Sequence, residues 1–454
     1  MAYQHPIATD STHEGHVLSV AQSAVLSGKS MLPFWFLGNN SARLNEDDHL
    51  GLWTSFDLSR KPSATTQKLN YFYGLEANGF AGSELRFSVI QAYAGIRTKF
   101  VDIHFGAREE FFGLNDTTLS IGNLFYGNNA RPIPKVVVQT PNWRKSPIFG
   151  SFLSFKAYLA HGWLEKDRYQ SGAYLHQKYL YFRAQLLDKR LQIIGGLHHS
   201  AQWSGHNDET GTGQPSGLSD FWRILTASSG NENADRIDQL NALGNHLGTY
   251  DLNASFRLKK FTLTNYWQFM WEDKSGLTPF NWRDGLVGFS IKKNSKQGLI
   301  YGFNLEIIRT NSQDAIKYDE EGNEFIEPDN FFNNSIYQSG WTFDKRVIGN
   351  PIFLILNPGA RTNALVKNMV NGVNLGLEGR FKQISYRFNY RHLKTRGTFR
   401  ETFNPAIKLS SISGDLELPL KKSNLRLRGV IEWGNYPGKN AGLIFTYSRQ
   451  FGLK

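Results

Sequence analysis

The segment 196–205, with the sequence GLHHSAQWSG, is the most distinctive group of side chains that could do chemistry. It contains His198, His199, Gln202 and Trp203, and it lies where an expected strand ends and a long loop begins. Imidazole and amide groups can hydrogen-bond sugar hydroxyls, and an indole ring can stack on the apolar face of a pyranose. The segment is therefore a candidate sugar-binding site. The structural alternative is that a histidine bonds a loop backbone and Trp203 belongs to an aromatic girdle.

Catalytic and metal chemistry have weaker support in the sequence. Adjacent strand residues point to opposite faces, so His198 and His199 are not expected to chelate one metal ion. Asp102 and His104 would share a strand face, as a hydrolase site requires, but alternating polar residues in a wet lumen explain them equally well. The chain has no cysteine, no phosphate-binding glycine loop, no Gly-x-Ser-x-Gly and no His-Glu-x-x-His. We predict no catalytic site, no metal site and no cofactor.

Four arginines on two expected strands define a second polar group. Arg387, Arg391, Arg426 and Arg428 are expected on the faces opposite the apolar residues. In an open barrel they would form an anion-selective wall. In a closed barrel they would be ion-paired filler, which we favour because an acidic residue, Glu432, shares their face.

The elements that carry these residues read as β-strands with one apolar and one polar face. From residue 384 onward, aliphatic and aromatic side chains alternate with serine, asparagine and arginine, and the segments 261–272, 425–433 and 443–448 repeat the pattern. We count 18 such strands, an even number that places both termini at one end of a barrel. The fold class is thus all-β, a single antiparallel transmembrane β-barrel.

The connections between the strands are of two kinds. Short turns alternate with long loops near 106–132, 202–248 and 311–372, which we assign to the cell exterior. Within the long loops, 218–225 and 234–243 read as short helices that could cap or fill the barrel mouth. We find no linker to a second domain, so residues 1–454 form one domain.

Composition agrees with a barrel. Aromatic residues make up 14% of the chain and glycine is abundant at 43 residues, yet the mean hydropathy is only -0.42. No stretch approaches the ~20 apolar residues of a membrane-spanning helix. The segment 1–11 lacks the pattern of a signal peptide, and we take the chain as a mature one.

A net charge of +12 indicates acidic partners. Anionic lipid, lipopolysaccharide and acidic polysaccharide all qualify. Nucleic acid is not expected, because no run of six basic residues occurs and the lysines gather in short turns.

Several sequence blocks, in order, resemble the Wzi-type capsule-assembly family in the form common in Bacteroidetes. The resemblance implies an 18-stranded barrel of the bacterial outer membrane, occluded at both ends, that acts as a lectin anchoring capsular polysaccharide. It does not supply a list of sugar-binding residues, so we offer Arg131, His198, His199, Gln202 and Trp203 as candidates. The matching blocks are NARPIPK (129–135), HQKYLY (176–181), GLHHSAQWSG (196–205), GNHLG (244–248) and WEDKSG (271–276).

Three functions are thus open. The leading hypothesis is a surface lectin without enzymatic activity. The alternatives are a channel for anionic solutes and a scaffold whose loops dock another outer-membrane protein.

Overall fold

The computed structural model describes residues 15–62, 69–146, 152–272, 284–313, 316–318, 321–326, 328–355 and 366–453. Two sequence predictions lie outside the described residues: the absence of a signal peptide in 1–11, and the part of the last family block that covers 273–276.

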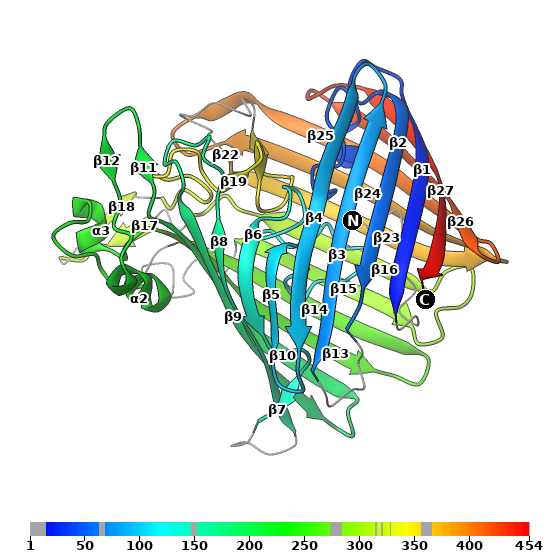
Figure 1. Ribbon diagram of the computed structural model, residues 1–454, viewed down its shortest axis with the longest axis horizontal. Helices are drawn as coiled ribbons and strands as arrows, with labels where there is room; N and C mark the ends of the chain where they lie inside the picture. The colour runs from blue at the N-terminus through cyan, green and yellow to red at the C-terminus, as the bar shows by residue number, and fades with distance from the viewer. Residues whose placement is uncertain are drawn as a thin grey trace.

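Eighteen strands form a closed antiparallel wall, which confirms the predicted fold and strand number (Figure 1). The ring closes where β1 pairs along its whole length with β27, from His16 opposite Leu453 to Ser27 opposite Gly442. The two-residue strand β7 (Arg144–Lys145) is an extra that pairs only with β8. The wall strands are β1 (His16–Ser27), β2 (Leu50–Arg60), β3 (Asn70–Ala81), β4 (Leu85–Arg97), β5 (Asp102–Ala107), β6 (Pro134–Gln139), β8 (Leu153–Trp163), β9 (Tyr174–Leu186), β10 (Leu191–Trp203), β13 (Asn245–Arg257), β14 (Phe261–Glu272), β15 (Gly285–Lys293), β16 (Gly302–Arg309), β23 (Val370–Phe381), β24 (Ile384–Gly397), β25 (Thr402–Pro419), β26 (Ser423–Gly434) and β27 (Asn440–Leu453).

The two faces of each strand differ as the alternation predicts. On β27, Leu443 and Phe445 are exposed, whereas the alternate residues Ile444 and Thr446 are buried. The same holds along β24, where Phe388 and Tyr390 are exposed and Arg387 is buried. An apolar exterior around a polar or filled lumen is the arrangement of a barrel that sits in lipid.

The links differ sharply between the two ends of the barrel. At the end that carries both termini, five links have only two to four residues: 98–101, 187–190, 258–260, 382–383 and 420–422. The longest links lie at the other end: 28–49, 108–133, 204–244 and 310–369. In barrels of this type the short turns face the periplasm, and the long links face the cell exterior.

The links contain short helices and hairpins. None of the helices described is long and apolar enough to cross a membrane. The elements are α1 (Phe34–Leu37), α2 (Leu218–Thr226) and α3 (Arg236–Leu240), and the hairpins β11 (His206–Asn207) with β12 (Thr212–Gly213), β17 (Ile316–Tyr318) with β18 (Glu324–Ile326), β19 (Thr342–Phe343) with β20 (Arg346–Val347), and β21 (Leu354–Ile355) with β22 (Val366–Lys367).

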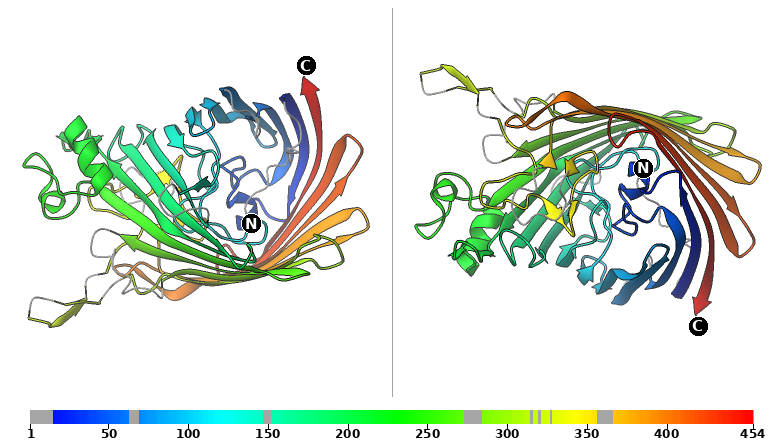
Figure 2. Two further views of the ribbon diagram at one scale, coloured as in Figure 1. Left: turned by 90° about the horizontal axis from the view of Figure 1, so that it is seen from below. Right: turned by 90° about the horizontal axis from the view of Figure 1, so that it is seen from above.

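The two helices predicted in the link 204–244 exist as α2 and α3, but the expectation that they close the barrel mouth is wrong. Both lie outside the ring of strands (Figure 1; Figure 2). The physical reason is that the apolar side of α2, with Phe221 and Ile224, packs against Trp203 on the outward face of β10. Other links occupy the lumen.

Candidate functional site

Three long links fold back into the barrel and fill its lumen. We call their described parts 28–49, 108–133 and 328–355 the plug, and Figure 2 shows these blue, cyan and yellow segments within the curve of the strands. Their apolar side chains form one core with inward-facing wall residues such as Tyr266 and Met270. The buried plug side chains include Trp35, Phe36, Leu44, Ile121, Leu124, Phe125, Tyr126, Phe331, Phe332, Trp341, Ile348 and Phe353.

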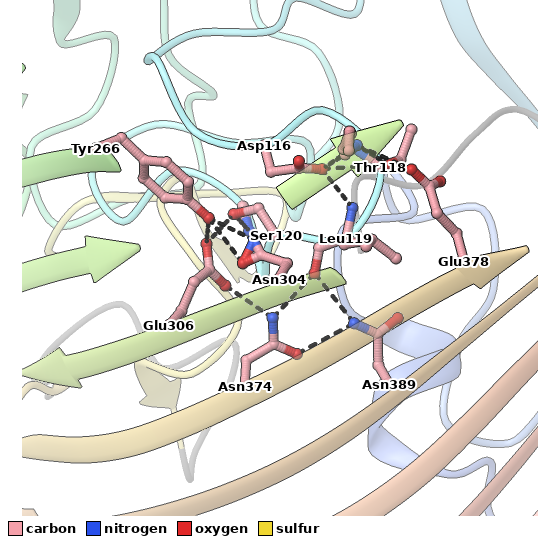
Figure 3. Close-up of polar contacts among 12 residues, drawn as sticks. Asp116, Thr118, Leu119, Ser120, Tyr266, Asn304, Glu306, Asn374, Glu378 and Asn389 are labelled. Carbon is pink, nitrogen blue, oxygen red and sulfur yellow. Dashed lines mark hydrogen bonds and ion pairs between the residues drawn. The ribbon is translucent and has the colours of Figure 1, made fainter. Parts of the chain in front are cut away.

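Glu306, an inward residue of β16, anchors the middle segment of the plug (Figure 3). One carboxylate oxygen accepts hydrogen bonds from the Ser120 hydroxyl and, at 2.8 Å, from the Tyr266 hydroxyl. The other accepts the Ile121 backbone N–H and the Asn374 side-chain amide, both at 2.8 Å. An ionised carboxylate has about four acceptor positions, so these four donors satisfy Glu306 in full.

Adjacent contacts hold the same plug segment along its length. The side-chain amides of Asn374 and Asn389 both donate to the Leu119 carbonyl, at 2.9 and 3.0 Å. Further toward the periplasmic end, the ammonium group of Lys292 lies 2.9 Å from an Asp116 carboxylate oxygen. The segment is therefore fixed to β15, β16, β23 and β24 by polar contacts as well as by packing.

A second buried cluster ties the plug to the opposite wall. The Lys135 ammonium group donates to Glu110, to the Gln177 side-chain carbonyl at 3.0 Å and to the Tyr126 hydroxyl at 3.2 Å. The Gln177 amide in turn lies 3.0 Å from Nε2 of His198. Because a buried charge is costly unless it is paired and hydrogen-bonded, this cluster favours one arrangement of the plug.

Three of the four inward arginines of β24 and β26, Arg387, Arg426 and Arg428, are ion-paired, as the filler interpretation predicts. Arg426 makes a bidentate contact with Asp415, with its Nε 2.7 Å from one carboxylate oxygen. Arg428 and Arg387 approach the same carboxylate at 3.3 and 3.8 Å. The partner is thus Asp415 of β25 and not Glu432.

Glu432 and Arg391 have another role, because both contact the first plug segment. Glu432 accepts the backbone N–H groups of Phe34 and Trp35, at 2.8 and 2.9 Å. The Arg391 guanidinium lies 4.3 Å from the centroid of the Trp35 ring. A cation over an indole face is favourable, and more so when water is excluded.

The structure separates the predicted sugar-binding residues. His198 faces the lumen, where its ring lies 4.8 Å from Phe112 and 4.7 Å from Phe125. His199 faces outward and stacks on Trp271 at 5.6 Å. The prediction that the two histidines point to opposite faces is therefore confirmed.

Gln202 and Trp203 are separated in the same way. The Gln202 amide faces the lumen and donates to the Gly340 carbonyl of the plug at 3.0 Å. Trp203 faces outward, against Tyr174 and Phe221. All four of these residues of β10 are buried, with at most 3% of their surface exposed.

Arg131 is the accessible member of the predicted set. Its side chain is 37% exposed, and its guanidinium donates to the Val89 carbonyl at 2.6 Å and lies 3.4 Å from Asp344. Lys345, next to Asp344 between β19 and β20, is exposed. These residues lie at the exterior rim of the barrel, where the long links meet the wall. Arg131 and Lys345 are the two cations of this part of the rim, and Asp344 is its carboxylate.

The link 164–173 extends this surface, because Arg168 fixes it to the β19–β20 hairpin. The buried Arg168 guanidinium donates to the carbonyls of Thr342 and Gly340, at 2.6 and 3.0 Å. Beside it, Lys166 is exposed and Tyr169 is half-buried. We call Arg131, Lys166, Tyr169, Asp344 and Lys345 the rim patch.

Metal ligands do not gather in the described part of the chain. No group of three or more histidine, aspartate or glutamate residues there has the geometry to hold a metal ion.

The sequence predictions missed the residues that anchor the plug. In the sequence, Glu306 and Arg43 appear only as charged residues on or near predicted strands. Their partners cannot be identified there because they are distant in sequence: Ser120 lies 186 residues from Glu306. Arg43 binds Glu76 in a bidentate pair, at 2.6 and 2.7 Å. The signal available was an isolated carboxylate at an inward position of an apolar strand, which requires a buried partner.

Asp238 of α3 gives the exterior link 204–244 a dependence on pH. It is buried, accepts the Gly244 backbone N–H at 2.9 Å, and has its pKa raised by burial to about 6. Because the pKa of Asp238 is higher in the folded link than in the unfolded chain, the carboxyl group stabilises the folded link most below pH ~4. This contribution is lost as the pH rises through about 6. A two-unit shift corresponds to at most about 3 kcal/mol.

We therefore expect backbone protection in residues 228–244 to fall between pH 4 and pH 7, measured by hydrogen exchange against Asp238→Asn at each pH. The variant should show no such fall. Glu232→Gln, which removes an exposed carboxylate from the same link, is the control and should behave as the native protein does. Equal pH dependence in all three proteins would contradict the prediction.

The closed wall, its apolar exterior and the plugged lumen define the class of protein: an integral outer-membrane β-barrel occupied by its own links. The family model for capsule assembly protein Wzi matches residues 11–354, so the chain belongs to that family and the sequence resemblance is confirmed.

Solved structures are similar in fold at low sequence identity. Wzi from Escherichia coli, an outer-membrane protein involved in group 1 capsule assembly and described as a carbohydrate-binding β-barrel, is 16% identical with a TM-score of 0.62, over 96% of this chain and 85% of that one. OccK5 (OpdH) from Pseudomonas aeruginosa is 10% identical with a TM-score of 0.49, over 97% and 99%. OprD from the same organism is 10% identical with a TM-score of 0.47, over 97% and 95%. No curated protein matches the sequence.

Proposed function

We propose that this protein is an outer-membrane lectin that binds capsular polysaccharide and anchors it at the cell surface. Membership of the Wzi capsule-assembly family carries the proposal. The plug supports it, because a filled lumen leaves the exterior rim, and not a pore, as the surface that meets large extracellular molecules.

The rim patch is the proposed glycan contact. Guanidinium and ammonium groups such as those of Arg131 and Lys345 bind the carboxylates of acidic sugars, and Tyr169 offers an aromatic face to a sugar ring. Among the other residues predicted from sequence, His198 and Gln202 contact the plug below the rim. His199 and Trp203 pack on the outside of the wall. We assign these four a positioning role.

The contacts inside the barrel disfavour an anion channel. Three of the four inward arginines share the Asp415 carboxylate, and Arg391 is covered by Trp35 of the plug. The role we propose is also not enzymatic: Asp102 is bound by Arg97 in a bidentate ion pair. Lipopolysaccharide and outer-membrane protein partners are compatible with this role.

Glycan binding by the purified protein tests the proposal. Arg131→Ala with Lys345→Ala should weaken binding to capsular polysaccharide from the source organism about tenfold or more, since a hydrogen bond to a charged group contributes about 1.5–3 kcal/mol. The affinity of the native protein should also fall as salt is raised. Biolayer interferometry on detergent-solubilised protein gives the dissociation constants.

The matched control is Lys421→Ala with Lys422→Ala, which removes two exposed cations from the β25–β26 turn at the periplasmic end. It changes the net charge equally and should leave the affinity unchanged. If both double variants bind like the native protein, the rim patch is not the site. If the native protein retains no glycan, the lectin proposal fails.

A further inference from the structure

The helix α2 lies on the outside of the barrel wall. On β9, Gln177 reaches the lumen and its neighbours His176 and Lys178 point outward. Phe221 of α2 packs 5.8 Å from the outward-facing His176 ring, and Ile224 is fully buried beside it. The Lys178 ammonium group donates to the Leu225 carbonyl in the last turn of the helix. One side of α2 is thus fixed to the wall.

The other side of α2 is apolar and uncovered in the described structure. Leu218 and Trp222 are 77% and 58% exposed, and Leu225 is half-buried. These residues follow an i, i+4, i+7 spacing and so form one stripe along the helix. An apolar stripe that stays exposed on a water-soluble surface is unfavourable, which indicates an occupant.

The wall next to α2 identifies that occupant. Going down β9 from Lys178, the next outward residues are Leu180 and Phe182, both exposed, and they belong to the apolar band that faces lipid. Leu180 is only two residues, or about 7 Å along a strand, from Lys178. The stripe on α2 therefore continues the lipid-facing surface at the exterior margin of that band.

Aromatic residues mark the same level. Trp163, Tyr174 and Trp203 are outward residues at the exterior ends of β8, β9 and β10, around Phe221. Tryptophan and tyrosine gather at the boundary between acyl chains and headgroups. The ionised groups of α2 are balanced, because Arg223 lies 3.2 Å from Asp220, so apolar contact and not charge would bind the helix to this boundary.

We propose that α2 is an interfacial anchor, in which Leu218 and Trp222 insert into the outer leaflet at the boundary between acyl chains and headgroups. The helix would lie in the plane of the membrane, as amphipathic interfacial helices do, and would hold the long link 204–244 against the membrane surface. The inference does not depend on glycan binding.

The absence of cysteine from the chain allows single labels to test this. Trp222→Cys carrying a bimane fluorophore is reconstituted in phosphatidylcholine vesicles that contain a nitroxide near the head of the acyl chain. We expect strong quenching, close to that of a lipid-facing standard at Phe182→Cys and far above an aqueous standard at Lys421→Cys. Both orientations in the vesicle place α2 at a leaflet surface, so mixed insertion does not affect the result.

Quenching as low as at the Lys421→Cys standard would overturn the proposal. Low quenching together with a disulfide-linked dimer of the unlabelled Trp222→Cys variant would also overturn it, because a second copy of the chain would then be the occupant.

A functional variant gives an independent readout. Leu218→Ser with Trp222→Ser removes the outer stripe and leaves Phe221 and Ile224 on the wall. In vesicles, we expect protease to cut the link 204–244 of this variant about tenfold faster than that of the native protein. Leu240→Ser, in exposed α3, is the control and should not change the rate. Equal rates for all three proteins in vesicles would overturn the proposal.

Discussion

Replacing plug residues 113–127 with a flexible glycine–serine segment should make the barrel conduct ions, whereas the native barrel should show no conductance. The replacement removes five buried apolar or aromatic residues, among them Leu124 and Phe125, and the donors to Glu306 from Ser120 and Ile121. The lumen of an 18-stranded barrel is wider than side chains alone can fill, so loss of the middle plug segment should open an aqueous path beside the two remaining segments. Single-channel recording in a planar bilayer should show conductance steps for the variant and none for the native protein.

The control replaces residues 206–213, the β11–β12 hairpin, in the same way. This hairpin belongs to the link outside the ring of strands and should leave the barrel silent (Figure 1). Steady conductance in the native protein, or silence in the plug variant with a folded barrel, would show that residues 113–127 do not occlude the lumen.

The second large effect is expected from Asp415→Ala. The variant leaves Arg426, Arg428 and Arg387 without the carboxylate they share, in a part of the lumen where their side chains are at most 10% exposed. Removing one partner of a buried ion pair typically costs about 3–5 kcal/mol, because the remaining charge is uncompensated. Thermal unfolding in detergent, followed by circular dichroism and by the electrophoretic mobility of the folded barrel, measures the loss.

Glu417→Ala is the matched control for that experiment. It removes the same charge from the same strand, but Glu417 is half-buried and accepts a hydrogen bond from the neutral Asn424 amide. We expect a loss below about 1 kcal/mol there. Equal losses at the two positions would mean that the arginine cluster does not depend on Asp415.

Residue alternation was enough to predict the wall. A period of two assigns each side chain to one face, so the inward arginines of β24 and β26 and the opposite directions of His198 and His199 followed from sequence position alone. The strand number and the difference between the two ends came from the same pattern. These features are local, and each strand carries its own signal.

The plug and the site were not predictable in this way, because their partners are distant in sequence. The apolar side of α2 looks the same whether Phe221 meets the lumen or the outer wall, since periodicity identifies a face but not what covers it. Gln202 resembles a sugar ligand in sequence, yet its amide is taken by Gly340, 138 residues later. The rim patch likewise joins Arg131 to Asp344 across links with no common pattern.

The seam between β1 and β27 constrains the order in which the molecule assembles. It joins the two ends of the chain: the hydroxyl groups of Ser23 and Thr446, 423 residues apart, lie 2.8 Å from each other across it. Phe36 packs against this seam so closely that a side chain at Gly442 would begin 2.8 Å from its ring. A sealed ring offers no opening through which Phe36 and its neighbours could enter from the side. Pairing of the first strand with the last requires both ends of the chain, so the ring can close only after the whole chain is available.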